Sequence, residues 1–532
     1  MVAHTGLRGA AALWIVLFHS IGIFCTWQLD WQGSSLMPLF FELSGFALAV
    51  TYGRMTWRDQ SSCCGAGRGG GKGGASGSRE ESKPETGVSA PPAAAIVVTE
   101  ARVEEGDFSN SLIKNATMPA ADTSKQSSPP LPPSFHKRAF FQNRFARVLP
   151  VYYLCLLICI PLWVFGFAPM PFTPESFWFP ALVSFIPVGT VFSWGTFNLD
   201  GPCWFVCTVF VMWLFFPCLI VRAQRLTDAE LVARIVYCFW GQLLILQTIY
   251  YVLEPFVGFW PAFQTATWNP FSRLPVFMMG MYAGLLVLRH PLPLPPSSSG
   301  MVDGDQQQQQ QQQQHDQDTM PWAPCFLGMW PVFPSSPIGT TTTSTTTTTT
   351  SCCRRPATPT STAQWSRLAT RQSLGLLTFT LVVGALDTFL RIGRGSPTGV
   401  SGAPWMQSIV AMTQLNIIVA LTRDGGTSLA SKALRTPFAA WLGKLSMNVY
   451  MVHMPVILYF VFLVLRKAKP NPFDCTTVAA GEDLDACMND FGTYQLMPPW
   501  GVFVVVPVSL AIAEGLHRWV EEPLRERFRC KE

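Results

Sequence analysis

The first apolar stretch of the chain contains two ionisable residues, Arg8 and His19. An ionisable side chain inside a membrane helix costs free energy, and it is therefore a candidate for function. Eleven residues at about 100° each place both side chains on one helix face, about 16 Å apart, with Arg8 at the cytoplasmic rim and His19 near mid-membrane. Histidine titrates near neutrality, which suits a general base acting on a hydroxyl group. The alternative is a histidine that hydrogen-bonds within a helix interface and has no catalytic role.

Four further residues in apolar stretches are candidates for a functional role. Glu42 could orient His19, or it could lie exposed at the rim. Ser44 and Gly45 could stabilise an oxyanion, although such a glycine more often lets two helices approach closely. His453 is a second intramembrane histidine, which could belong to an acceptor site or to helix packing.

Composition indicates the environment of these residues. Hydrophobic residues make up 49% of the 532 residues and charged residues 13%, whereas soluble domains carry about 25% charged residues. Apolar runs of about 20 residues are long enough to cross a bilayer as helices, and they lack the alternation of barrel strands. We therefore expect an all-α polytopic membrane protein in contact with membrane lipid. The net charge of +5 gives no indication of a nucleic-acid partner, and the fifteen cysteines show no metal-ligand spacing.

The apolar runs predict about ten transmembrane helices. Their expected bounds are 9–28, 36–53, 148–168, 203–222, 235–253, 271–289, 373–391, 405–422, 441–465 and 498–517. Residues 177–195 are also apolar, but Pro180 and Pro187 favour a re-entrant or interfacial segment. With that assignment most Lys and Arg residues fall on one side, which predicts that both termini are cytoplasmic.

Two long cytoplasmic loops have low sequence complexity and should be disordered, because neither can bury enough apolar surface to offset its chain entropy. They span residues 59–137, rich in Gly, Ser, Ala and Pro, and residues 291–371, with Gln and Thr tracts. The predicted membrane domain therefore comprises residues 1–58, 138–290 and 372–532. In an outer loop, Cys475 and Cys487 could form a disulfide or remain two thiols. Asn115 matches a glycosylation acceptor but falls on the cytoplasmic side.

Seven segments resemble, in order, the signatures of the acyltransferase 3 family of membrane acyltransferases. They are GLRGAAALWIVLFH (6–19), FFELSGFALA (40–49), FFQNRFARVLPVYY (140–153), PCWFVCTVFVMWLFFP (202–217), SRLPVFMMGMYAGLL (272–286), LGKLSMNVYMVHMP (442–455) and WVEEPLRERF (519–528). The resemblance covers the membrane spans and omits the two low-complexity loops. The chain departs from the family at Thr5, where an Asp is usual, and at Val209 and Phe210, where many bacterial members carry an acid.

This resemblance implies transfer of an acyl group, often acetyl, from acyl-CoA to a hydroxyl of a carbohydrate or lipid acceptor. Arg8, Arg144 and Arg147 would then bind the phosphates of CoA, since arginine binds phosphate oxygens through paired hydrogen bonds. His19 would deprotonate the acceptor hydroxyl, and no bound cofactor or metal is implied. For Arg144 and Arg147 the alternative is that they flank the third span and set its orientation. The departures leave His19 without an assigned acidic partner.

Two other functions fit the same composition. A transporter could use His19 to couple substrate movement to protons, although no inverted repeat is visible in the sequence. A non-catalytic family member acting as a scaffold is the third possibility. Transfer of label from acyl-CoA to an acceptor separates the first function from these two.

Overall fold

The structure is a computed structural model of the full chain. It describes residues 2–23, 33–57, 134–135, 137–164, 182–191, 200–257, 259–290, 324–325, 330–331, 365–378, 382, 404–465 and 497–528. The chain divides into two compact units. One consists of Met1–Gly53 with Lys137–Glu532, and the other of Arg54–His136.

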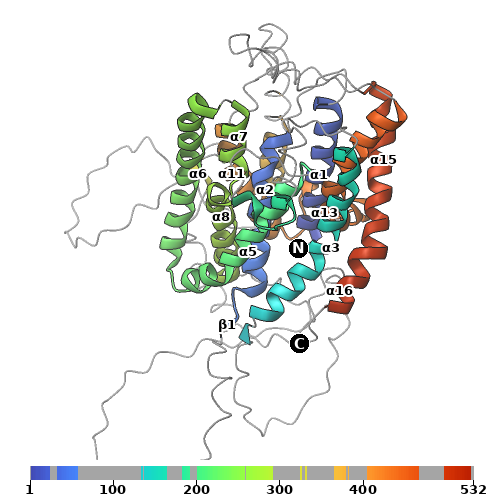
Figure 1. The fold of residues 1–532 in the computed structure, drawn as a ribbon. Coiled ribbons are helices and arrows are strands. Elements are labelled where there is room, and N and C mark those ends of the chain that lie inside the picture. The colour runs from blue at the N-terminus through green and yellow to red at the C-terminus, as the bar shows by residue number, and fades with distance from the viewer. Residues whose placement is uncertain are drawn as a thin grey trace, which may run out of the picture. The chain divides into compact units, whose positions relative to one another are not determined.

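The first unit is built from helices, which Figure 1 shows running roughly alongside one another. In chain order they are α1 (Val2–Leu17), η1 (Phe18–Ile23), η2 (Gly33–Leu36), α2 (Met37–Tyr52), α3 (Lys137–Val164), η4 (Gly189–Val191), α5 (Cys203–Gln224), α6 (Asp228–Val257), α7 (Phe259–Trp268), α8 (Pro270–Arg289), a helix at 365–378, α11 (Pro404–Arg423), α12 (Leu429–Leu434), α13 (Pro437–Tyr459), η7 (Phe460–Val464), α15 (Pro499–Leu516), η10 (His517–Glu521) and α16 (Glu522–Phe528).

In the described part of the chain, four strands of two residues each accompany the helices. In the second unit, β1 (Thr56–Trp57) pairs in parallel with β2 (Ser134–Phe135). In the first unit, β3 (Pro324–Cys325) pairs with β4 (Trp330–Pro331) in antiparallel fashion.

Six helices in the described part of the chain are long and apolar enough to cross a membrane. They cover Lys137–Leu162, Cys203–Gln224, Asp228–Leu253, Ala262–Arg289, Pro437–Val464 and Pro499–Phe528. Each overlaps one of the ten expected spans, so the helical, multi-pass membrane class is confirmed. The full number of ten remains a prediction.

The other four expected spans correspond to shorter or partly described helices. Span 9–28 overlaps α1 and η1, and span 36–53 matches the shorter apolar helix α2. Span 405–422 matches α11, whereas span 373–391 only partly overlaps the helix at 365–378. Asn115, Cys475, Cys487 and most of the two low-complexity loops lie outside the described residues.

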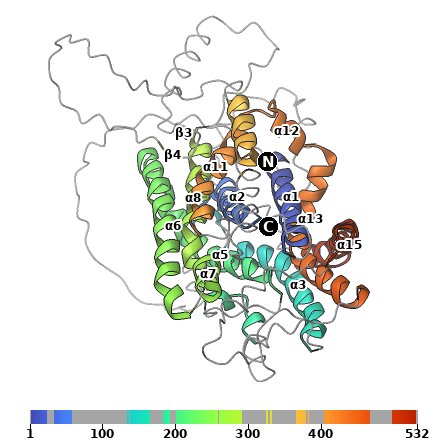
Figure 2. The same ribbon diagram turned by 90° about the horizontal axis from the view of Figure 1, so that it is seen from above.

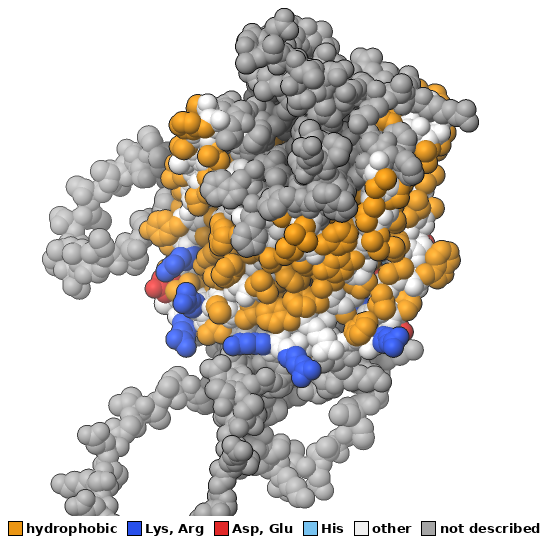
Figure 3. Space-filling view, in the orientation of Figure 1, with side chains coloured by type: hydrophobic (Ala, Val, Ile, Leu, Met, Phe, Trp, Pro, Cys, Tyr) orange, Lys and Arg blue, Asp and Glu red, His pale blue; other side chains and the backbone are white. Residues whose placement is uncertain are grey.

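The surface of the first unit agrees with a membrane setting. Figure 3 shows hydrophobic side chains over most of the described face, with Lys and Arg gathered along its lower edge. Large exposed apolar side chains include Phe256, Phe503 and Trp519, which in water would form an aggregation-prone surface. The ends of α5, α8 and α16 carry arginine, and α3 begins with Lys137. Basic residues at helix ends are typical of a membrane boundary.

Local sequence signals explain where several helices begin. Thr227 and Glu230 exchange backbone-to-side-chain hydrogen bonds at the start of α6, which is a capping box. The Asn269 side chain accepts a hydrogen bond from the Phe271 N–H, ahead of α8, and Pro270 occupies the first helical position. Thr436 and Pro437 begin α13 in the same way.

Helix α13 holds one side of the bundle together, because it contacts α1, α3 and α15. Figure 2 shows these four helices on one side, and α6, α7, α8 and α11 toward the other, with α2 and α5 between them. On that second side α2 packs along α8. The site described next lies where α1 meets α13.

Candidate active site

The structure brings His19 and His453 into direct contact. His453 Nε2 lies 2.8 Å from His19 Nδ1, and the ring centroids are 4.9 Å apart. His453 lies on α13 and is fully buried, whereas His19 is partly exposed. His19 belongs to η1, a π-helical turn that continues α1, and such turns often occur at functional sites.

The hydrogen bonds of the pair determine which nitrogen carries each proton. A backbone carbonyl can only accept, so His453 Nδ1, 2.7 Å from the Tyr450 carbonyl oxygen, must be protonated. In neutral His453 the Nε2 is then an acceptor, and it receives the N–H of His19 Nδ1. This arrangement leaves the lone pair of His19 on Nε2, the atom that could accept a proton from a substrate.

Glycines set the close contact between α1 and α13 that places the two histidines. A Cβ on Gly9 would lie 2.5 Å from the Gly443 nitrogen, and a Cβ on Gly443 would lie 2.1 Å from the Thr5 carbonyl oxygen. A Cβ on Gly6 would likewise clash with the carbonyl oxygen of Leu434, at the end of α12. Small residues let membrane helices approach this closely. The backbone contact is therefore part of the site.

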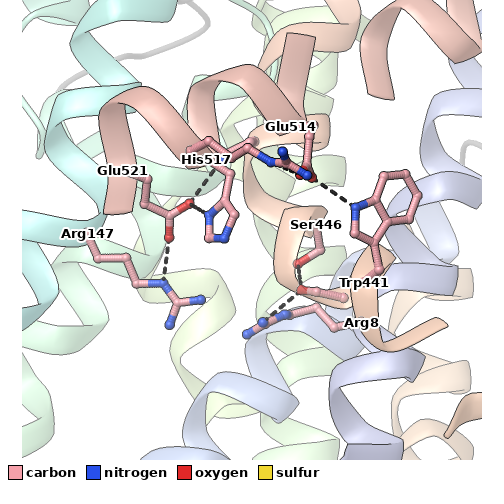
Figure 4. A network of polar contacts seen from close by, with 10 residues as sticks. Arg8, Arg147, Trp441, Ser446, Glu514, His517 and Glu521 are labelled. Atoms are coloured by element: carbon pink, nitrogen blue, oxygen red, sulfur yellow. Dashed lines mark hydrogen bonds and ion pairs between the residues drawn. The ribbon is translucent and has the colours of Figure 1, made fainter. Parts of the chain in front are cut away.

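Arg8 also contacts α13, about three helical turns from the histidine pair. Its Nη2 donates to the Gly443 carbonyl oxygen at 3.0 Å, and the Ser446 hydroxyl donates to the same oxygen at 2.9 Å (Figure 4). Arg8 and His19 thus contact one helix, as expected for residues on one face. Arg8 is partly buried against α13.

Arg147 is held by an acid from the end of the chain. Its Nε lies 3.3 Å from Glu521 Oε1, while Glu521 Oε2 accepts from Asn448 Nδ2 at 2.9 Å and lies 2.9 Å from His517 Nδ1. Figure 4 shows the guanidinium groups of Arg147 and Arg8 pointing toward each other. Arg144 lies instead beside the Phe140 ring, 6.0 Å from its centroid. We call Arg8 and Arg147 the arginine pair.

The remaining predicted residues lie on α2, where Glu42 and Gly45 pack against α8 and Ser44 contacts α5. A Cβ on Gly45 would lie 2.1 Å from the Phe277 carbonyl oxygen, so the packing interpretation of Gly45 agrees with the structure. The Ser44 hydroxyl accepts a hydrogen bond from Trp213 Nε1 at 3.3 Å. Glu42 is fully buried, which excludes the expected alternative of rim exposure. Among the described residues, neither of its carboxyl oxygens has a hydrogen-bond partner.

Three further residues near the histidine pair or at the start of α5 were not predicted from the sequence: Asp200, Cys203 and Tyr450. The Tyr450 ring centroid lies 5.8 Å from that of His453. The Cys203 thiol donates to Asp200 Oδ2 at 3.3 Å, and Asp200 is only 2% exposed. Asp200 lies two residues before Pro202 of the PCWFV segment, so an acid at the start of a span was the available signal.

Across the ranges that the structure describes, no group of three or more His, Cys, Asp or Glu side chains is placed to hold a metal ion. The chain matches no protein-family model, no curated protein and no solved structure. The class of the protein therefore follows from its own fold and site: a multi-pass helical membrane protein with a histidine pair inside its helix bundle.

Proposed function

We propose that this protein is a membrane acyltransferase that moves an acyl group, in the simplest case acetyl, from acyl-CoA to a hydroxyl group of a carbohydrate or lipid. The observation that carries this proposal is the hydrogen-bonded pair of His19 and His453, which leaves His19 Nε2 as a base. The ordered motif resemblance to acyltransferase 3 proteins supports the same reaction.

In the proposed reaction, His19 Nε2 takes the proton of the acceptor hydroxyl as its oxygen attacks the thioester carbonyl. The imidazolium that forms is stabilised because its Nδ1–H donates to His453 Nε2. The tetrahedral intermediate then collapses, the carbon–sulfur bond breaks, and the CoA thiolate takes the proton back from His19. The products are an ester and free CoA, and His19 returns to its starting state.

The arginine pair is the proposed site for the CoA phosphates, with Arg144 one helical turn from Arg147. Arg147 and Arg8 approach α13 through Glu521 and Gly443 respectively. Asn448 shares Glu521 with Arg147, and Gly443 accepts a hydrogen bond from Arg8. These two residues of α13 are five positions apart, about 7.5 Å along the helix axis. The two guanidinium groups can therefore hold one phosphorylated ligand. From Arg8 to His19 the distance along α1 is about 16 Å, a span that an extended pantetheine arm can bridge.

The direct test is incubation of membranes containing the protein with acetyl-CoA labelled in its acetyl group. The expected result is label in a chloroform-soluble or polymeric product, with release of one CoA thiol for each acetyl transferred. Membranes from cells lacking the protein provide the background. Absence of transfer from acetyl-CoA and from longer acyl-CoA donors would contradict the proposal.

Proton-coupled transport is the second candidate, and it has one observation in its favour. Two buried acids, Glu42 and Asp200, each carry at least one carboxyl oxygen that has no hydrogen-bond partner among the described residues. Buried carboxyls and histidines are the groups that carry protons through transporters. Transport predicts uptake into vesicles that depends on a pH gradient and forms no acylated product. A non-catalytic protein would show neither uptake nor product.

Changing His453 to phenylalanine should lower kcat for acyl transfer by about 10²-fold, because His19 loses the acceptor that keeps its proton on Nδ1. His453→Gln should retain more activity, since an amide oxygen can accept the same N–H. In both variants the KM for acetyl-CoA should stay near that of the wild type. Initial rates at varied acetyl-CoA concentration check this, and equal loss of activity in the two variants would argue against the tautomer role.

Changing Glu521 to glutamine should raise the KM for acetyl-CoA several-fold with little change in kcat, because the carboxylate that holds Arg147 becomes a neutral amide. Glu514→Gln is the matched control. Glu514 lies on the same helical segment but bonds to Arg518 and Trp441 instead of Arg147. Steady-state kinetics on folded, detergent-purified protein distinguish the two variants. An unchanged KM in Glu521→Gln would remove Arg147 from the donor site.

A further inference from the structure

Arg273 is a charged side chain in the interior of the bundle that the proposed reaction does not use. It lies near the start of α8 and is fully buried. Its Nε donates to the Thr267 carbonyl oxygen at 2.6 Å, and its Nη2 donates to the side-chain oxygen of Gln407. Neither partner is charged. Among the described residues, Nη1 has no hydrogen-bond partner and no acid forms an ion pair with Arg273.

An arginine in this position is costly. Moving a cation from water to a membrane interior carries a large free-energy penalty unless an anion or several hydrogen bonds compensate it. Two neutral acceptors satisfy part of the guanidinium, and the described residues supply no counterion for its charge. A bound anion would supply both the missing charge and the acceptor for Nη1.

Two buried polar side chains that lie close in sequence to the partners of Arg273 also have unused hydrogen-bonding capacity among the described residues. Gln264 lies three residues before Thr267 on α7, and so on the same face of that helix. Both of its amide atoms lack a hydrogen-bond partner in the described part of the structure, as does the hydroxyl of Ser408, which follows Gln407 on α11. Both side chains are buried. An oxyanion accepts hydrogen bonds from guanidinium, amide and hydroxyl groups alike.

The location of Arg273 separates it from the proposed donor site. Arg273 lies sixteen residues before Arg289, about 24 Å along α8, and Arg289 pairs with Asp228 at the α5–α6 turn. Figure 2 places α8 on the far side of α2 and α5 from α3 and α13, which carry or contact the arginine pair. CoA phosphates held by the arginine pair would therefore not reach Arg273.

A row of aromatic rings connects Arg273 with the histidine pair. Trp268 follows Thr267 and stacks on Trp204, with ring centroids 5.6 Å apart. Phe205 lies next, with its centroid 5.2 Å from that of Tyr450, and Tyr450 adjoins His453. The two polar sites thus lie at the two ends of one aromatic row.

We propose that Arg273 binds an anionic group, a carboxylate or a phosphate, of the molecule whose hydroxyl is acylated at His19. This inference rests on the proposed function and specifies its acceptor: a hydroxylated compound that carries a negative charge. The guanidinium holds the anionic end, and the acceptor extends along the aromatic row so that its hydroxyl reaches His19 Nε2.

The charge of the product tests this inference without any mutation. Membranes containing the wild-type protein are incubated with labelled acetyl-CoA, and the labelled product is applied to an anion exchanger at pH 7. We expect the product to be retained and to elute with salt. Loss of retention after phosphatase treatment identifies a phosphate monoester, and persistence identifies a carboxylate or a phosphodiester. A labelled product that is not retained overturns the inference, whereas absence of any labelled product contradicts the proposed function itself.

Variants of Arg273 provide the second measurement. With purified protein and a dilution series of membrane extract as acceptor, Arg273→Gln should raise the half-saturating extract concentration at least tenfold. The KM for acetyl-CoA should not change. The half-saturating extract concentration of Arg273→Lys should lie between those of the wild type and Arg273→Gln. Arg289→Gln, which removes an arginine from the edge of the bundle, should behave as the wild type. Unchanged half-saturation in folded Arg273→Gln overturns the inference, and if that variant does not fold, the charge of the wild-type product decides.

Discussion

Replacing His19 by alanine is expected to lower the rate of acyl transfer by about 10²- to 10⁴-fold, the usual contribution of a general base. The variant keeps the arginine pair, so acetyl-CoA should still bind with nearly unchanged affinity. It loses Nε2, the nitrogen whose lone pair is directed by the hydrogen bond from His19 to His453. The measurement is the initial rate of label transfer from acetyl-CoA, divided by the amount of folded protein.

His4→Ala is the matched control for this experiment. His4 is a second histidine of α1, but its Nε2 lies 2.9 Å from the Ile418 carbonyl oxygen, and it therefore faces α11 instead of α13. Its ring stacks on Phe46, away from the histidine pair. The control should retain its transfer rate per folded molecule. A rate for His19→Ala within twofold of the wild type would exclude His19 as the base.

A single methyl group added at Gly443 is expected to have the second large effect. A Cβ at this position would lie 2.1 Å from the Thr5 carbonyl oxygen, so Gly443→Ala must push α1 and α13 apart. Overpacking of this kind usually costs about 1–3 kcal/mol of stability. The shift also separates His19 from His453, and a displacement of about 1 Å at a catalytic group can reduce the rate by about 10²-fold.

Gly241→Ala provides the control, because a Cβ at Gly241 meets no atom within 4 Å. Alanine in a helix interior is favoured over glycine by about 0.5–1 kcal/mol, so this variant should be as stable as the wild type or more so, with unchanged activity. Thermal unfolding in detergent and acetyl transfer measured on the same samples test both variants. Wild-type activity in Gly443→Ala would show that the close contact of α1 and α13 is not needed for the site.

Both predictions concern the contact between His19 and His453, which one variant removes and the other displaces. His19→Ala removes the reacting atom and should leave the fold intact, whereas Gly443→Ala keeps every reacting atom and changes where one of them lies. Loss of activity in both, with loss of stability in only the second, would support a site whose chemistry depends on the contact between two helices.

Several features could be predicted from the sequence because they depend on local composition. Runs of apolar residues predict membrane helices wherever they occur, since the backbone must satisfy its hydrogen bonds within the helix. Six of the expected spans match helices of sufficient length and apolarity. The shared face of Arg8 and His19 follows from helix periodicity alone, and both residues contact α13. Close packing at Gly45 was likewise one of the two interpretations of that residue.

Other features depend on pairs of residues far apart in the chain. His19 and His453 are separated by 434 positions, and no local pattern indicates that one histidine is the partner of the other. Glu521 reaches Arg147 across 374 positions. Asp200 and Arg273 are single charged residues at the edges of apolar runs, where sequence alone does not distinguish an exposed side chain from a buried one.

Hydropathy and helix periodicity are properties of short segments, so they were enough to predict the class of the protein and to identify His19 as a candidate. The partner of His19, the protonation pattern of the pair and the burial of Arg273 and Glu42 could be seen only in the folded chain. Those depend on which helices lie side by side, and glycine contacts such as that between Gly443 and Thr5 set this arrangement at the level of the backbone.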